Sequence, residues 1–218
     1  MRIDLASPID SGGFRAEANR LLGQQVPPTD IAWEAVLSPD LGVRYRGDGA
    51  GPSTPSAVNA IVPRSFVRLT ELVTLHRDGR RFDLLYRLLW RLVHEPELAG
   101  AHDDGDMAQA RAMAQSVRRD VQRACKAARL RPLAPQADVA LALAWCVPQH
   151  HVTEQVAAWL AGQHPAPLWL LASPDRCVLW TGRHLLCAPG IAARAADAME
   201  DAQWHAVAAQ LAAAVPPA

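Results

Sequence analysis

The spacing of the apolar residues changes twice along this chain of 218 residues, and these changes restrict the folds it can adopt. Both ends carry short apolar runs typical of strands, whereas apolar residues in the middle recur every three or four positions, as in amphipathic helices. We therefore expect an α+β fold, in which a small mixed sheet packs with an Arg-rich helical segment.

Residues 1–37 are expected to form a βαβ-like unit. The stretches "RIDLA" and "IAWEAV" alternate as strands do, and Asp10 or Ser11 can cap an intervening helix that Gly23 ends. The next stretch, about 38–61, is dense in Gly, Pro and Ser and lacks periodicity, so we expect a linker without regular structure there.

Residues 62–132 are expected to form three helices. The first begins at Pro63, a residue that is favourable in a first helical turn. The second carries a buried stripe formed by Phe82, Leu85, Tyr86, Leu89 and Val93. The third carries a narrow apolar seam formed by Met107, Ala110, Ala114, Val117, Val121, Ala124 and Ala128.

Residues 137–214 are expected to follow the order β-α-β-β-β-α. "ADVALALAWCV" is a nearly continuous apolar run, which suits an internal strand. A short helix follows, with Val152, Val156 and Trp159 facing inward, then three short strands and a final helix over about 194–213. We interpret residues 1–218 as a single domain.

Basic residues are concentrated in two helical stretches, 64–91 and 111–131, although the formal net charge of the chain is zero. All but one of the 22 basic side chains are arginines, which suit phosphate and carboxylate recognition. The candidate phosphate-binding residues are Arg87, Arg91, Arg111, Arg118, Arg119 and Arg123. Such residues can follow a phosphate backbone. The alternative is a solvated helix face whose arginines pair with carboxylates elsewhere in the fold.

Two adjacent histidines, His150 and His151, follow Pro148 at the expected start of a helix. With Pro148 in the first turn, the apolar stripe directs His150 away from the core and places His151 at its flank. A neutral imidazole can accept a proton, so both histidines are candidate catalytic bases. The alternative is a pair of polar helix-start residues that bond to nearby backbone.

No metal site is expected from the sequence. Cys146, His150, Cys177 and Cys187 fit no compact zinc-ligand spacing, and apolar cysteines within strands are more often core residues. The sequence indicates no particular cofactor. It also shows no secretion signal and no apolar run long enough for a membrane span, so we expect a cytoplasmic protein that does not enter a membrane.

Three stretches in this order, "HRDGRRFDLLYRLLWRL", "AMAQSVRRDV" and "AWCVPQHHV", resemble a bacterial domain of unknown function. Members of that family occur alone or fused ahead of a uracil-DNA glycosylase domain. They are typically encoded beside a radical S-adenosylmethionine protein thought to act in DNA modification or repair. The resemblance extends over about residues 1–204. Besides the arginines and histidines above, the matching residues are His76, Arg77, Asp78, Tyr86, Trp90, Asp120 and Trp145.

The resemblance implies a role in DNA metabolism but no particular reaction. It suggests DNA, a radical S-adenosylmethionine protein and a uracil-DNA glycosylase as candidate partners. The chain departs from the family after Asp120, where a His-Lys-Met stretch is usual, and it ends before the family's basic, aromatic tail. We therefore expect a diverged member with altered or lost activity.

Three hypotheses follow. The first is an accessory protein of DNA metabolism that contacts nucleic acid or a partner enzyme through its Arg-rich helices. The second is an enzyme acting on nucleic acid or a nucleotide, with His150 or His151 as the general base and arginines holding phosphate. The third is a docking module for a radical enzyme that never touches DNA.

Overall fold

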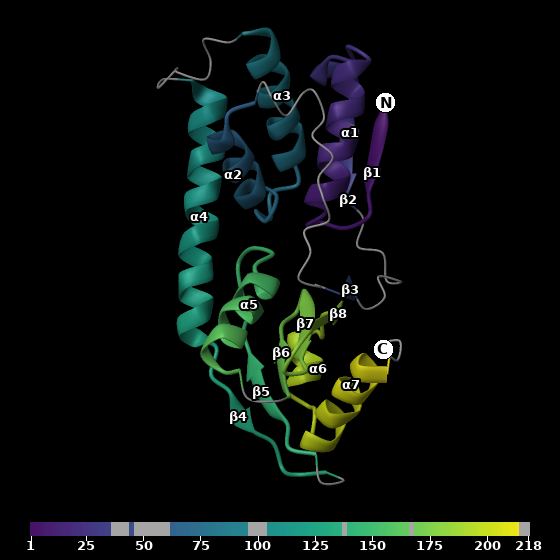
Figure 1. The fold of residues 1–218 in the computed structure, drawn as a ribbon, viewed down its shortest axis with the longest axis vertical. Helices are drawn as coiled ribbons and strands as arrows, with labels where there is room; N and C mark the ends of the chain where they lie inside the picture. Colours follow the sequence, from purple (N-terminus) through teal and green to yellow (C-terminus); the bar gives the residue numbers. More distant parts are fainter. Residues whose placement is uncertain (36–43, 46–61, 96–103, 137–138, 166–167, 214–218) are drawn as a thin grey trace. The chain divides into compact units, whose positions relative to one another are not determined.

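The computed structural model describes residues 1–35, 44–45, 62–95, 104–136, 139–165 and 168–213 (Figure 1). Its helices and strands form an α+β fold, as expected. The chain divides into two compact units. Unit 1 comprises Met1–Ser38 and Ser53–Arg119, and unit 2 comprises Pro39–Pro52 and Asp120–Ala218. The interpretation of the chain as one domain stays a prediction.

Unit 1 combines two parallel strands with helices. Its elements are β1 (Arg2–Leu5), α1 (Ser11–Gly23), the 3₁₀ helix η1 (Pro28–Asp30), β2 (Ala32–Ala35), α2 (Arg64–Val73), α3 (Arg81–His94) and the first part of α4 (Gly105–Ala127). Strand β1 pairs with β2 in register from Arg2 opposite Ala32 to Leu5 opposite Ala35. The expected N-terminal βαβ-like unit is therefore present.

Helix α1 begins where the sequence predicted. The carboxylate of Asp10 accepts a hydrogen bond from the backbone N–H of Gly13 at 2.9 Å, which satisfies one of the free donors of the first turn. A side chain at position 13 would displace that carboxylate, so the observed geometry of the cap favours glycine.

An aromatic cluster forms the core of unit 1. The ring of Phe14 lies 4.9 Å from that of Trp33 and 5.3 Å from that of Phe82, and Trp33 lies 5.8 Å from Tyr86. The expected stripe on α3 is thus largely confirmed, although Val93 is only partly buried. The stripe is broader than predicted, because further leucines of α3 are also buried, namely Leu84, Leu88 and Leu92.

The apolar seam of α4 is confirmed over most of its length, and Arg111, Arg118, Arg119 and Arg123 are exposed. One position differs. Asp120 is buried, whereas its neighbour Val121 is only partly buried. Because a buried carboxylate needs hydrogen-bond partners, this difference marks a polar contact within unit 2.

Unit 2 is built on a mixed sheet with the strand order β3-β8-β7-β6-β5-β4. Its strands are β3 (Arg44–Tyr45), β4 (Arg131–Pro132), β5 (Ala142–Trp145), β6 (Trp169–Ala172), β7 (Arg176–Trp180) and β8 (Leu185–Pro189). Strand β5 is parallel to β6, and the other pairings are antiparallel. The parallel pair is joined through α5 (Thr153–Gln163), so these elements form a second βαβ unit.

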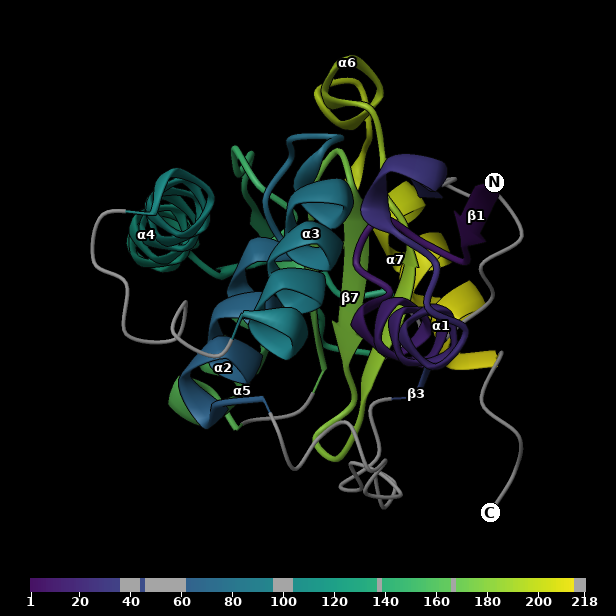
Figure 2. The ribbon, with the colours of Figure 1, turned by 90° about the horizontal axis from the view of Figure 1, so that it is seen from above.

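Helices cover both faces of this sheet (Figures 1 and 2). Leu170 and Leu179 pack in one cluster with Trp204 of α7 (Asp201–Ala213). Leu171 and Val178 alternate with them and point to the opposite face, where α5 packs on β7. Burial on both faces explains why the strand sequences are continuously apolar rather than alternating.

Four sequence-based expectations for unit 2 are corrected. Residues 44 and 45, placed in the unstructured linker, pair with Leu186 and Cys187 of β8, while the remainder of 38–61 lies outside the described residues. Helix α5 begins at Thr153 rather than near Pro148. Trp159 is 40% exposed instead of inward. The final helix is divided into α6 (Ala193–Ala196) and α7, because the non-helical residues 197–200 interrupt it.

Among the helices in the described ranges, none combines the length and apolar character that crossing a membrane requires.

Candidate functional site

Two of the candidate phosphate-binding arginines, Arg87 and Arg91, are engaged by carboxylates within unit 1. Arg87 donates from Nε and Nη2 to the two carboxylate oxygens of Asp106, at 2.8 and 2.7 Å. Arg91 donates from Nη2 to Asp104 at 2.8 Å. These charge-assisted bonds attach the start of α4 to α3. We call Arg87, Arg91, Asp104 and Asp106 the α3–α4 clamp.

The clamp shifts the pKa of each of its members. The hydrogen bond from Arg87 lowers the pKa of Asp106, and that from Arg91 lowers the pKa of Asp104. The same bonds raise the pKa values of Arg87 and Arg91. The charges of these two arginines are thus compensated inside the fold, which favours the structural interpretation for them over phosphate binding.

The arginines farther along α4 are different. Arg111, Arg118 and Arg119 are exposed, and in the part of the chain that the structure describes no carboxylate pairs with them. The same holds for Arg68 on α2. These four residues, all in unit 1, are called the arginine face below.

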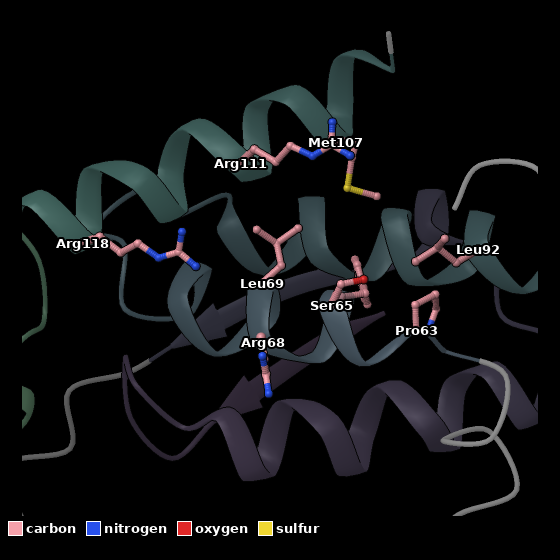
Figure 3. A pocket seen from close by; sticks show the side chains of 9 residues that line it. Pro63, Ser65, Arg68, Leu69, Leu92, Met107, Arg111 and Arg118 are labelled. Atoms are coloured by element: carbon pink, nitrogen blue, oxygen red, sulfur yellow. The ribbon is translucent and has the colours of Figure 1, made fainter. Parts of the chain in front are cut away.

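Three members of the arginine face line a pocket of about 310 Å³ between α2, α3 and α4 (Figure 3). Arg111 and Arg118 come from α4, and the side chain of Arg118 reaches toward α2. The third arginine is Arg68 of α2. The other lining residues are Pro63, Ser65, Phe66, Leu69, Leu92 and Met107. The site therefore combines an apolar floor with guanidinium groups, which suits a ligand that has both apolar and anionic parts.

Arg123 belongs to unit 2 and has a partner. Its guanidinium donates to Oδ1 of Asp120, whose side chain is only 1% exposed. Oδ2 of Asp120 accepts the backbone N–H of His150 at 2.8 Å. Asp120 therefore connects the C-terminal half of α4 with the loop that precedes α5. These two hydrogen bonds explain why a carboxylate is buried beside the apolar seam.

The expected orientation of His150 is wrong. His150 is 7% exposed and buried, not directed away from the core, because it lies in a loop before α5 and the helical rotation used to place it does not apply. His151 is partly buried, and its Nδ1 lies 3.2 Å from Oδ2 of Asp175. The two adjacent histidines thus have different surroundings.

The pair formed by His151 and Asp175 lies where the parallel strands β5 and β6 end. The loop after β5 carries His151, and the turn after β6 carries Asp175. Nearby, Arg176 donates to Glu154 at 3.0 Å, and Thr153 shares a hydrogen bond with Ser173 at 2.9 Å. Polar groups at the carboxyl ends of parallel strands are a frequent location for ligand sites.

The turn that carries Asp175 is held in place by the loop after β8. The backbone N–H of Ile191 donates to the carbonyl of Ser173 at 3.0 Å. Any side chain at Gly190 would collide with the backbone of Pro174, so only glycine permits this approach.

The other residues singled out by the resemblance have structural contacts. Tyr86 donates its hydroxyl to the carbonyl of Val26 at 2.7 Å, and burial raises its pKa to about 12. Trp90 stacks on His94 with ring centroids 4.2 Å apart. Trp145 contacts Trp204 in unit 2. The contacts of Tyr86 and Trp145 connect their elements to other segments, whereas the stack of Trp90 on His94 lies within α3.

His76, Arg77 and Asp78 occupy the turn between α2 and α3. Nδ1 of His76 accepts a hydrogen bond from the backbone N–H of Asp78 at 3.1 Å. The carboxylate of Asp78 accepts one from the backbone N–H of Arg80 at 2.8 Å. This turn therefore forms a local hydrogen-bonded structure at the start of α3.

The cysteines do not form a metal site in the described part of the chain. No group of three or more His, Cys, Asp or Glu side chains able to hold a metal is found there. Burial raises the pKa of the Cys146 thiol to about 12 and that of Cys177 to about 11, which keeps both protonated at neutral pH and poorly reactive.

A family model described as a domain of unknown function, DUF4130, matches residues 79–209. The match covers more than half of the chain. The chain belongs to this family. No curated protein and no solved structure matches it.

The DUF4130 region contains the α3–α4 clamp, three members of the arginine face, and both histidines. It begins after α2, so Arg68 and the N-terminal βαβ unit lie outside it. The similarity expected for residues 1–78 stays a prediction, as do the roles of the individual site residues.

Several residues that pair with the candidate residues or line the pocket were not anticipated from the sequence. Asp104 and Asp106 precede or begin α4 and resembled ordinary helix-start acids. Asp175 lies in the "SPDR" stretch, which the sequence predicts only as a turn between two strands. Arg68 lies one helical turn after Ser65 on α2, beside Leu69. This i, i+3 spacing next to an apolar residue is the sequence signal that could have identified Arg68 as part of a site.

Proposed function

We propose that this protein acts in DNA metabolism by binding the phosphate backbone of nucleic acid through the arginine face. The proposal rests on one observation: Arg68, Arg111, Arg118 and Arg119 are exposed and unpaired among the described residues, whereas Arg87, Arg91 and Arg123 are neutralised. An arginine paired with a carboxylate of the fold has its charge compensated, whereas several unpaired arginines on one surface favour an anionic partner.

The formal net charge of zero makes this binding local rather than general. A neutral protein has no long-range attraction to DNA, so affinity must come from the few phosphates that the arginine face contacts. Phosphate contacts fix position and carry no base information, so the proposal predicts binding without strong sequence preference.

The test is a titration of labelled duplex DNA at several salt concentrations. The wild-type protein should show a log–log slope of about −0.9 for each phosphate contacted. Replacing both Arg118 and Arg119 with Glu should weaken binding to all sequences alike and flatten the slope. The matched control, Arg183→Glu with Arg194→Glu, makes the same change in charge at two exposed arginines of unit 2 and should leave the slope unchanged.

Absence of salt-dependent DNA binding in the wild-type protein would reject the proposal. The protein would then be better understood as a docking module. The proposed function also suggests how partners are met: we propose that the radical S-adenosylmethionine protein and the uracil-DNA glycosylase suggested by the family resemblance act on the same DNA. In a pull-down, nuclease treatment should release partners that are held through shared DNA. Partners that dock directly on the protein should be retained.

The pair formed by His151 and Asp175 supports a second candidate, an enzyme acting on nucleic acid or a nucleotide. A carboxylate beside Nδ1 orients an imidazole and leaves Nε2 to accept a proton from a substrate. Products of incubation with DNA or nucleotides can be followed by mass spectrometry. Loss of a product in His151→Ala, at an unchanged melting temperature, would support this activity, and a product that persists would exclude His151 as its base.

A further inference from the structure

The pocket in the arginine face combines features that a flat phosphate-binding surface does not need. Leu69, Leu92 and Met107 form an apolar floor contributed by three helices, and Arg111 and Arg118 stand beside it (Figure 3). Phosphates of a duplex would use the arginines and leave the apolar floor in water. The floor therefore indicates a ligand with a flat or apolar part that enters the pocket.

We propose that this pocket takes one unstacked nucleotide, so that the protein prefers single-stranded or locally opened nucleic acid. This inference rests on the proposed function and names its substrate. At about 310 Å³ the pocket lies at the small end of ligand sites, which matches a base with part of its sugar rather than a base pair. Stacked bases of a duplex cannot enter it, whereas an unstacked base can.

The spacing of the two α4 arginines agrees with a nucleotide strand bound at this pocket. Arg111 and Arg118 are seven residues apart, which is two helical turns, or roughly 10.5 Å along the axis. With backbone positions that far apart, the two long side chains can contact different phosphates of one strand. A guanidinium plane can also stack on a base.

The chemistry of the lining predicts little discrimination between bases. Ser65 is the one neutral polar side chain among the residues that line the pocket, and a single hydroxyl cannot read the edge of a base in the way that a bidentate contact does. Met107 is a flexible, polarisable side chain that adapts to different shapes. Purines and pyrimidines should therefore both be accepted.

Filling the pocket tests the inference. Ser65 is exposed at the pocket's edge, so Ser65→Trp can occupy the pocket while every arginine is kept. Thr29→Trp adds the same side chain to an exposed position of η1 that does not line the pocket. Affinities are measured for an oligothymidine strand and for a duplex of equal length.

Ser65→Trp should lower affinity for the single strand by roughly tenfold, the loss expected for one base contact, and leave duplex affinity and its salt slope unchanged. Thr29→Trp should change neither. Equal affinities of Ser65→Trp and the wild type for the single strand would overturn the nucleotide pocket. The proposed function would still be supported in that case if Arg118→Glu with Arg119→Glu flattens the salt slope.

A direct measurement with the unaltered protein covers the case in which Ser65→Trp does not fold. A 2-aminopurine base within an oligothymidine strand fluoresces more strongly when it is unstacked. Its emission should change on binding and become shielded from a soluble quencher. An emission that remains fully accessible to the quencher in the bound strand would contradict entry of a base into the pocket.

Discussion

At the scale of single residues, Asp120 shows how one buried carboxylate can organise a loop. It accepts the backbone N–H of His150 and a guanidinium hydrogen of Arg123. Asp120→Ala would leave that N–H without its partner in a buried place, and we expect a loss of about 2–3 kcal/mol in the free energy of unfolding. Arg123→Ala, which removes an exposed partner, should cost less than about 1 kcal/mol.

Denaturation by urea would measure both changes, with Asp120→Asn as a further control because its amide oxygen can still accept the hydrogen bond. If Asp120→Ala and Arg123→Ala have equal effects, the bond to His150 contributes nothing and the assignment of Asp120 as an anchor is wrong.

Arg81 provides a second test at this scale. It is 3% exposed and donates to the carbonyls of Thr74, Asp78 and Pro8, and burial lowers its pKa to about 10. Arg81→Met removes the charge and leaves the carbonyls of Thr74 and Pro8 without this donor, while that of Asp78 keeps only the backbone N–H of Arg81. We therefore expect a loss of about 3 kcal/mol in the free energy of unfolding. A melting temperature equal to or above that of the wild type would mean that the cost of burying the charge exceeds the value of its hydrogen bonds.

His150 and Asp120 also show the limits of the sequence at this scale. The prediction for His150 assumed a helix from Pro148, and helical rotation then turned its side chain outward. The residue lies before the helix, where orientation depends on the partner that its backbone finds. That partner, Asp120, is thirty positions earlier in the chain, and no local periodicity connects the two.

At the scale of elements, the clamp between α3 and α4 predicts how stability depends on pH. The pKa values of Asp104 and Asp106 are lowered in the folded protein. The clamp should therefore contribute its full stability above the unfolded carboxyl pKa of about 4, and lose it as the pH falls through the lower folded values.

Chemical denaturation between pH 6 and pH 3 would reveal this loss. Asp104→Asn combined with Asp106→Asn should be less stable at pH 6 and less sensitive to acid, because the titrating groups are absent. Parallel curves for the variant and the wild type would assign the acid sensitivity to other carboxylates.

Most elements could be predicted from the sequence because their signals are local. The cap at Asp10, the apolar stripe of α3 and the seam of α4 depend on residues within a few turns of one another. Strand β3 could not be predicted, since its two residues pair with β8 across a large separation in the sequence. The start of α5 was placed too early because proline and a polar pair resemble a helix start even when Val152 precedes the first turn.

At the scale of the whole molecule, the arginines divide into two populations that the sequence could not separate. Arg87 and Arg118 both lie on predicted helices in basic stretches. Only the fold reveals that Asp106 faces Arg87, while Arg118 borders a pocket without a described carboxylate partner. A count of charges cannot distinguish these cases, because the result depends on which acidic residues the fold brings near.

Two double variants with the same change in net charge can separate these populations. Replacing Arg87 and Arg91 with Glu removes the clamp and places new carboxylates beside Asp104 and Asp106, so we expect a loss of about 1–2 kcal/mol, or roughly 2–8 °C in melting temperature. Replacing Arg118 and Arg119 with Glu breaks no described ion pair and should shift the melting temperature by less than about 2 °C. If the second variant is destabilised as much as the first, Arg118 and Arg119 serve the fold, and the arginine face loses the residues on which its binding to nucleic acid depends.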